Sequence, residues 1–201
     1  REQTLSVLDS ALGEYRRIEG PDEGWRCENS IYVKKSLFTV LDYGRVDLQM
    51  PELHRGVFWV RLKTADEKAL FVATVHLTHQ LNADELRTDI GYRHNEAHLA
   101  AKALNFLIGS DDAILCGDFN AEPTSDEIRF LTSNAVIDGR STYFQDAWAV
   151  VRGNEVGWTQ DPANPVYAAM NLPPKRIDYV FVGNPFRRPR GGGRHQRRRG
   201  A

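Results

Sequence analysis

The sequence is poor in cysteine and has no long hydrophobic run. Its two cysteines, Cys27 and Cys116, cannot form a disulfide framework, and neither lies in a Cys-x-x-Cys pattern. No apolar stretch approaches the ~20 residues of a membrane-spanning helix, so we expect no membrane segment. The chain starts at Arg1 without the apolar region of a secretory signal peptide, and the sequence leaves its compartment undecided, cytoplasmic or secreted.

The composition is that of a soluble globular protein. The 201 residues are 41% hydrophobic and 26% charged, which excludes a disordered or collagenous chain. A chain of this length can build one domain with a sizeable core and has little room for a second.

The charges divide the chain into an acidic body and a basic end. Residues 183–201 contain seven arginines and no acid, which leaves 19 basic against 27 acidic residues in residues 1–182, a net charge of −8. We expect a folded domain over residues 1–182 and a disordered Arg/Gly-rich tail over residues 183–201, because the tail has almost nothing to bury. The tail is either an arm that binds RNA or DNA, or an unnatural end such as a frameshift leaves.

The first third of the body alternates between helical and extended patterns. Apolar spacing predicts a helix over residues 3–16. Residues 30–41 are rich in β-branched and aromatic side chains and predict two short strands. Residues 43–54 are expected to form a loop. Residues 56–62 and 69–77 predict an antiparallel pair of strands.

The rest of the body repeats this mixture. Residues 84–109 predict one helix, with these side chains facing inward: Leu99, Ala103, Phe106 and Leu107. Residues 112–116 predict a buried strand, and a capping box at 124–127 predicts a short helix. Residues 176–182 predict a strand that is covered on both faces. Together these elements predict a mixed α/β domain with sheet packed on sheet and helices outside.

The most informative segment follows the strand at residues 112–116. Gly117 ends the strand, and Asp118 and Asn120 would lie on one face of an extended chain, about 6.5–7 Å apart. The carboxylate can orient or deprotonate a water, and the carboxamide can donate to a phosphate oxygen. The alternative is an Asx-turn, in which the two side chains cap their own backbone.

Two further residues carry polar groups into apolar strands. His76 lies near the end of its strand and could act as a general acid or phosphate donor, or simply be satisfied by a backbone carbonyl. Asp178 would be costly to bury without a partner, such as a structural Arg or a His that it orients. The neighbouring Arg176 is a poor partner, since alternation puts it on the other face.

Four segments in order resemble the motifs of one superfamily. In chain order they are a Thr-Val-His-Leu strand (74–77), a Gly-Asp-Phe-Asn segment followed by Pro (117–123), a Gly-Trp-Thr-x-Asp loop (157–165) and an Arg-Ile-Asp-Tyr strand (176–182). Together they resemble the endonuclease/exonuclease/phosphatase superfamily with the DNase I-like fold. That resemblance implies a four-layer α/β sandwich, in which two packed mixed β-sheets are flanked by helices. It also implies hydrolysis of a phosphodiester or phosphomonoester with a divalent metal.

The resemblance assigns roles to the residues already singled out. Asp118 would activate the attacking water, and Asn120 would bind the phosphate. His76 matches a histidine near the leaving group, and Asp178 matches the aspartate that holds a second catalytic histidine. All four are therefore expected in the catalytic centre.

Further positions are implied with alternatives. Glu28 matches an acid that hydrogen-bonds the histidine of the site, but it could also be an ordinary loop residue. Arg55 matches a phosphate-contacting arginine, or is a solvated residue at a strand start. Thr159, in the loop motif, would contact the substrate. Three aromatics could stack on substrate or pack locally: Trp25, Trp158 and Tyr167.

The resemblance also implies Mg²⁺ or Mn²⁺ held by carboxylates. Its main glutamate ligand would lie before Arg1, leaving Asp118 as a possible ligand, and its final Ser-Asp-His does not follow Val182. The sequence is thus expected to lack the glutamate ligand and the Ser-Asp-His segment. One strand of each sheet is expected to be missing with them. The expected function is a metal-dependent phosphoesterase acting on nucleic acid, a lipid head group or a small phosphoester. The alternative is an inactive fragment or a protein that binds nucleic acid through its Arg-rich tail.

Overall fold

The structure is a computed structural model that describes residues 2–18, 30–51, 55–80 and 82–183. In this part of the chain, strands form a two-stranded and a six-stranded sheet. The small sheet pairs β1 (Tyr15–Ile18) with β2 (Ile31–Lys34). The large sheet contains β3 (Thr39–Asp47), β4 (Gly56–Lys63), β5 (Ala69–His76), β6 (Asp112–Asp118), β7 (Gln145–Asp146) and β8 (Asp178–Gly183).

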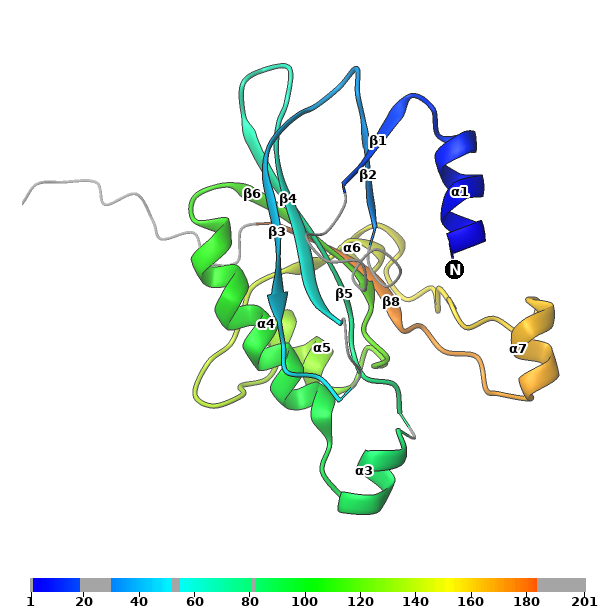
Figure 1. The fold of residues 1–201 in the computed structure, drawn as a ribbon. Coiled ribbons are helices and arrows are strands. Elements are labelled where there is room, and N and C mark those ends of the chain that lie inside the picture. Colours follow the sequence, from blue (N-terminus) through cyan, green and yellow to red (C-terminus); the bar gives the residue numbers. More distant parts are fainter. Residues whose placement is uncertain (1, 19–29, 52–54, 81, 184–201) are drawn as a thin grey trace, which may run out of the picture.

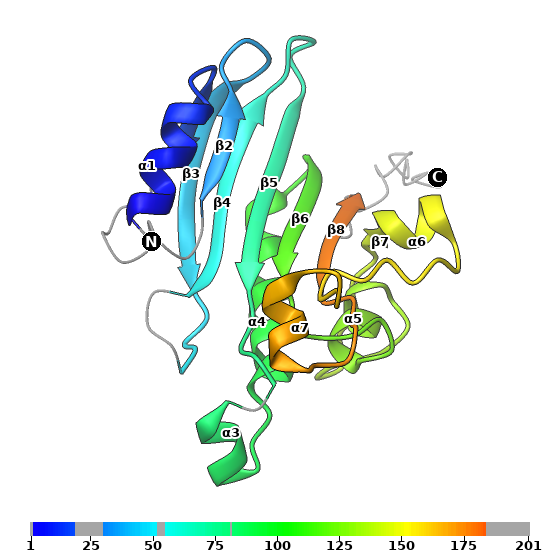
Figure 2. The ribbon, with the colours of Figure 1, turned by 90° about the vertical axis from the view of Figure 1, so that its right-hand side faces the viewer.

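The large sheet is mixed. Its strand order is β3-β4-β5-β6-β8-β7, and only the β5–β6 pair is parallel. Figure 2 shows β3 at one edge and β7, next to α6, at the other. The described helices are α1 (Glu2–Ala11), α3 (Ala83–Thr88), α4 (Tyr92–Ile108), α5 (Asp126–Leu131), α6 (Ala147–Arg152) and α7 (Pro165–Met170).

The two faces of the large sheet are covered by different elements. Figure 1 shows α4 on one side of the sheet and β1, β2 and α1 on the other. Alternate residues of β4 contribute to the cores on the two faces of the sheet. Val57 and Trp59 belong to the large core under α4, whereas Phe58 and Val60 belong to a small core under β1 and β2. The layers are therefore helix, large sheet, small sheet and helix, and the predicted DNase I-like α/β sandwich is confirmed.

Several predicted elements are confirmed. The strands at 56–62 and 69–77 form the antiparallel pair β4–β5, and the strand at 112–116 is β6, extended to Asp118. The two short strands expected within residues 30–41 are β2 and the beginning of β3. β4, β5 and β6 bury apolar side chains, as their sequences predict.

Two predictions for the first third of the chain are wrong. The helix expected over residues 3–16 ends at Ala11, because the chain turns around Gly13 and Tyr15 then pairs with Lys34 in a strand ladder. The loop expected over residues 43–54 is extended as far as Asp47, as part of β3. β3 is an edge strand with mostly exposed, partly charged side chains and an irregular register near Val40, so it lacks an alternating apolar pattern.

The helix expected over residues 84–109 is interrupted. Asp89 ends α3 in the left-handed conformation (φ 57°), and Gly91 precedes α4. The predicted inward face is right in part: Leu99 and Leu107 are partly buried against the core, whereas Phe106 is 88% exposed. The fully buried apolar residues of α4 are Ala97, Ala100, Ala101, Leu104 and Ile108.

Two finer predictions are corrected as well. Ser125 precedes α5, but its hydroxyl accepts from the Glu122 N–H at 3.0 Å, so the capping box does not form. The strand expected over 176–182 begins at Asp178, and its burial alternates. Phe181 is buried towards α4, whereas Val180 on the opposite face is 49% exposed, so β8 is not covered on both faces in the part of the chain that the structure describes. The tail from residue 184 onwards lies outside the described residues, and the predicted division into domain and tail stays a prediction.

Candidate functional site

Three predicted site residues form a row across neighbouring strands. In the ladder, His76 of β5 pairs with Asp118 of β6, and Asp118 pairs with Asp178 of β8. The strand neighbours Val75 and Tyr179 are buried in the core under α4, so alternation directs the side chains of the row to the opposite face. The His76 Nε2 atom lies 3.6 Å from Asp118 Oδ2.

Gly117 allows the strands of the row to approach. It adopts φ 140°, and a Cβ atom there would lie 1.9 Å from the carbonyl oxygen of Val75. No L side chain fits in that space, so glycine is required immediately before Asp118. The glycine of the Gly-Asp-Phe-Asn segment therefore sets the contact between β5 and β6 on which the row depends.

The environment of Asp118 makes its carboxyl group a weaker acid. The pKa of Asp118 is raised to about 6, mainly by burial and also by the negative charge of Asp178. The hydrogen bond from the Asn120 N–H and the charge of Arg55 act in the opposite direction. The half-buried carboxylate is ionised at neutral pH and still accepts a proton readily. This is the titration behaviour that a general base needs.

Asn120 both forms a turn and reaches across the site. Its backbone N–H donates to Asp118 Oδ1 at 2.8 Å, which is the Asx-turn that the sequence left open. Its backbone is left-handed (φ 47°), and its Nδ2 donates to the Leu77 carbonyl at 2.9 Å. A carboxamide nitrogen has two hydrogens, so the second N–H remains for a substrate oxygen. The Asx-turn thus leaves Asp118 Oδ2 facing His76.

A buried glutamate that the sequence did not single out fixes the segment after His76. Glu96 of α4 is 2% exposed and accepts from Thr78, at 2.9 Å from its N–H and at 2.5 Å from its hydroxyl. Leu77 N–H donates to the Asp118 carbonyl oxygen at 2.9 Å, and Arg93 donates to the Thr78 carbonyl oxygen. Burial raises the pKa of Glu96. The segment is therefore held between β6 and α4, and no pattern in the sequence indicated the Glu96 contact.

Arg55 precedes β4 and is only 9% exposed. The alternative reading of a solvated strand-start arginine is therefore wrong. Its charge lowers the pKa of Asp118, which puts the guanidinium within electrostatic reach of the row. A cation here offsets the negative charge of the two aspartates and could meet an anionic substrate.

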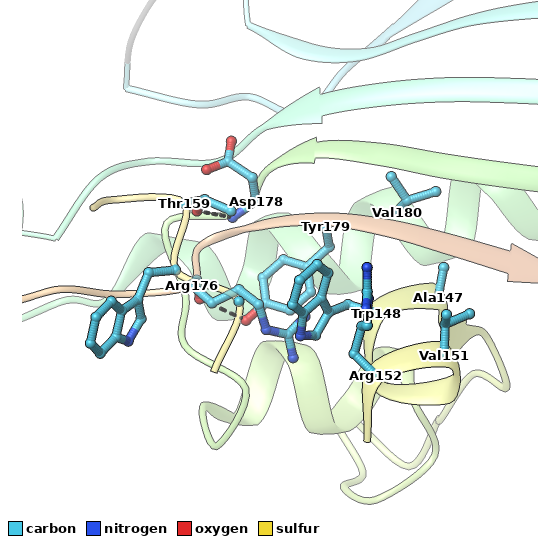
Figure 3. A pocket seen from close by; sticks show the side chains of 11 residues that line it. Ala147, Trp148, Val151, Arg152, Thr159, Arg176, Asp178, Tyr179 and Val180 are labelled. Carbon is cyan, nitrogen blue, oxygen red and sulfur yellow. Dashed lines mark hydrogen bonds between the residues drawn. The ribbon is translucent and has the colours of Figure 1, made fainter. Parts of the chain in front are cut away.

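Thr159 lies beside the last member of the row. Its hydroxyl accepts from the backbone N–H groups of Ile177 at 3.1 Å and Asp178 at 3.2 Å, and Figure 3 shows the bond from Asp178. Asp178 itself is exposed at the start of β8, so the burial cost expected for it does not arise. As expected, Arg176 is not its partner: Arg176 pairs with Asp146 at 2.7 Å and lies 4.6 Å from the ring centre of Tyr179.

A cavity of about 480 Å³ begins at this end of the row (Figure 3). Asp178 and Thr159 line it together with Trp158, which is 47% exposed. Tyr167 lies in α7 and is not a lining residue. Glu28 and Trp25 fall outside the described residues, so their predicted roles stay predictions.

The described residues do not by themselves make a metal centre. Among residues 2–18, 30–51, 55–80 and 82–183, no three His, Cys, Asp or Glu side chains gather closely enough to hold an ion. The row supplies two carboxylates and one imidazole, and Asp118 shares its carboxylate with Asn120 and His76. These residues alone supply too few ligands to hold a divalent cation. No described helix is long and apolar enough to span a bilayer.

Comparison with known proteins agrees with the fold. The family model described as the Endonuclease/Exonuclease/phosphatase family matches residues 3–196. The chain belongs to this family. No curated protein matches the sequence closely enough to be counted.

Solved structures of similar fold come from animals and bacteria. One is D. rerio TDP2 complexed with a single-strand DNA product, with a TM-score of 0.65 and 17% identity, covering 90% of this chain and 66% of that one. Bacteroides thetaiotaomicron mannosyl-6-phosphatase has a TM-score of 0.60 and 18% identity, covering 90% and 67%. The human Nocturnin catalytic domain with bound sulfate has a TM-score of 0.60 and 16% identity, covering 90% and 64%. At these identities the likeness establishes the fold of this family member.

Proposed function

We propose that this family member hydrolyses phosphate esters by direct attack of a water activated at Asp118. The observation that carries the proposal is the row of His76, Asp118 and Asp178 on three neighbouring strands, with Arg55 in electrostatic reach. Membership of the Endonuclease/Exonuclease/phosphatase family supports hydrolysis of a phosphoester as the reaction class.

In the proposed reaction Asp118 takes a proton from the attacking water. A carboxylate with a pKa of about 6 is matched to this task near neutral pH. His76, 3.6 Å away, would donate a hydrogen bond or a proton to the leaving oxygen. Arg55 would stabilise the negative charge that develops on the phosphoryl oxygens.

Asn120 and Thr159 would hold the substrate rather than move protons. The second amide hydrogen of Asn120 is directed by the bond that its first makes to Leu77, so the carboxamide can donate to a phosphate oxygen without reorganising. The Thr159 hydroxyl accepts two backbone N–H groups, which leaves its own proton available for a substrate oxygen. Asp178 would keep the basicity of Asp118 high.

Mg²⁺ or Mn²⁺ is proposed as the cofactor. The family resemblance supports it, and Asp118 is the described residue suited to share in binding a hard cation through oxygen. When bound, such an ion supplies positive charge to the phosphoryl oxygens. Hydrolysis measured in EDTA and with 5–10 mM added metal tests the requirement: a metal-dependent activity supports it, and equal rates in both conditions contradict it.

The proposed substrate class is an organic phosphoester. Among proteins of the same fold, one structure holds a single-strand DNA product and another protein is a mannosyl-6-phosphatase. These names support nucleic acids and small sugar phosphates as candidates, alongside lipid head groups. All share the phosphoryl group, which is the part that Asn120 and Arg55 would bind.

The test compares hydrolysis by the 201-residue chain and two variants. Bis(p-nitrophenyl) phosphate, a deoxyoligonucleotide and mannose 6-phosphate cover the candidate substrates. Asp118→Asn removes the base and should lower the rate by about 10²–10⁴, whereas Asp112→Asn, at the exposed far end of the same strand, should leave it unchanged. Full activity in Asp118→Asn contradicts the proposal. Salt-sensitive binding of the oligonucleotide without any hydrolysis favours the alternative, a nucleic-acid-binding protein that uses its Arg-rich tail.

A further inference from the structure

We propose that the cavity at the end of the row binds an aromatic ring carried by the phosphate ester. The inference rests on the proposed function, because it places the non-phosphate part of the same substrate. The ligand chemistry is a planar ring within a few bonds of the phosphate, as in a nucleotide or an aryl phosphate. A sugar or polyol phosphate without a ring would not use the cavity.

The cavity is contiguous with the row. Asp178 lines it and is also the ladder partner of Asp118. Val180, two residues along β8, lies on the same face and lines it too. A ring in the cavity would therefore extend along β8 away from a phosphate held beside Asp118.

The lining is mostly apolar and includes two indole rings. Trp148 and Trp158 line it with the exposed side chains of Val151 and Val180. Figure 3 shows Trp148, Val151 and Val180 on elements that are far apart in sequence, α6 and β8. A polyol would lose hydrogen bonds to water on such a surface, whereas an aromatic ring gains stacking and buried area.

Trp148 is a fixed wall of the cavity. Its Nε1 donates to the Glu155 carbonyl oxygen at 2.9 Å, and the Arg152 guanidinium lies 5.7 Å from its ring centre. The indole packs on the backbone of Gly157 so closely that a Cβ there would lie 2.3 Å from it. Gly157 also has φ 58°, a conformation that favours glycine. The glycine of the loop motif is thus explained by the shape of this wall.

The floor is equally well fixed. Arg176 is buried, pairs with Asp146 at 2.7 Å and lies over the ring of Tyr179. The Tyr179 hydroxyl donates to carbonyl oxygens of Ala121 and Arg176. Arg176 is thus held in an ion pair and Tyr179 in hydrogen bonds, so the floor keeps a fixed shape against which a flat ring can pack. A volume of about 480 Å³ is within the range of small-molecule sites.

The experiment measures binding, without turnover, of three phosphate monoesters to the whole chain. AMP and phenyl phosphate carry a ring, and ribose 5-phosphate does not. Calorimetry or ligand-observed NMR should show both ring-bearing esters binding more tightly than ribose 5-phosphate. If only AMP binds more tightly than ribose 5-phosphate, the ring is a nucleobase. If only phenyl phosphate does so, the ring is an aryl group. Equal affinity for all three esters overturns the inference.

Variants locate the ring. Trp158→Ala should weaken binding of the preferred ring ester by about 5- to 150-fold, as expected for one stacked base, and leave ribose 5-phosphate unchanged. Gly157→Ala should act in the same direction by displacing Trp148. Phe106→Ala removes an exposed aromatic from α4, on the other side of the sheet, and should change nothing. Unchanged ring binding in Trp158→Ala contradicts the proposal.

The two proposals fail in distinguishable ways. Ring preference with unimpaired hydrolysis by Asp118→Asn would overturn the catalytic assignment and keep the cavity. Hydrolysis that depends on Asp118 without any ring preference would keep the reaction and overturn the cavity as a ring site.

Discussion

The two faces of the six-stranded sheet are built for different purposes. The face towards α4 carries one continuous core that includes Phe71, Leu115 and Phe181, with Leu104 of α4 packed on it. On the opposite face, the described residues form a small core under β1 and β2. Towards β6 and β8 that face carries polar side chains, an exposed valine and a cavity.

The difference shows where stability and chemistry reside. Burial of large apolar side chains on the α4 face supplies most of the favourable free energy of folding. On the other face, the pKa of Asp118 is raised because the carboxylate is partly buried near a second carboxylate. Such an arrangement costs stability, and it persists because the α4 face holds the strands in register.

The largest contrast is expected between neighbouring residues of β8. Phe181→Ala opens a cavity in the core under α4 and should lower the free energy of unfolding by about 3–5 kcal/mol. Val180→Ala on the exposed face should lower it by less than about 1 kcal/mol. Urea unfolding followed by circular dichroism measures both. Equal losses in the two variants would mean that β8 is covered on both faces.

The next effect concerns the buried ion pair that joins β8 to α6. Arg176→Met leaves Asp146 buried without its partner and should cost about 3 kcal/mol or more. Asp146 also caps α6, accepting from the N–H groups of Trp148 and Ala149. The double variant Arg176→Met/Asp146→Asn, which keeps a capping side chain, should recover part of the loss. A single variant as stable as the wild type would show that the pair does not hold the cavity floor.

Glu96 of α4 binds Thr78, next to the row on the other face of the sheet. Its replacement should lower the rate of hydrolysis more than the affinity for substrate. Glu96→Gln keeps the shape but replaces one acceptor oxygen, so one bond to Thr78 is lost, at a cost of about 1–3 kcal/mol. If Glu96 positions the segment after His76, kcat should fall while KM changes little, and Glu96→Ala should fall further. Glu127→Gln, at a partly exposed glutamate of α5, serves as control. A loss of stability with unchanged kcat would make Glu96 a purely structural residue.

The smallest expected change in stability is an increase, in a variant of Asp118. The pKa of Asp118 is about 6 in the folded chain and about 3.9 in an unfolded one. The protonated carboxyl group therefore favours the folded state, and this contribution to stability is present below about pH 4 and lost as pH rises through 6. Asp118→Asn should therefore raise the free energy of unfolding by about 1 kcal/mol at pH 7.5, after allowance for partial exposure, and by nothing at pH 4. Thermal melts at the two pH values test this, and destabilisation at pH 7.5 contradicts it.

The sequence carried more information about the row than about what surrounds it. The four motifs that resemble the endonuclease/exonuclease/phosphatase superfamily predicted a common site for His76, Asp118 and Asp178, and the strand ladder places these residues in one row. The continuation of β3 beyond residue 41 was missed, since exposed strands lack an apolar period. The inward face of α4 was predicted only in part, because several of its buried residues are alanines, which mark a face weakly.

Contacts between distant segments gave no sequence signal. Glu96 is a polar residue in a polar helix, and its bonds to Thr78 depend on how α4 packs. The cavity depends on α6, the loop before Thr159 and β8 meeting in space. Gly157 was noted as part of a motif. Only the structure shows why glycine is needed there: the indole of Trp148 packs on its backbone.

The most direct test of the account is a carboxyl NMR titration of Asp118. In the wild-type chain the pKa should be about 6. It should fall in Asp178→Asn, where a neighbouring negative charge is removed, and rise in Arg55→Met, where a positive charge is removed. An Asp118 that titrates near its ordinary value of about 3.9, and does not respond to either variant, would contradict the claim that this face of the sheet holds a base prepared for catalysis.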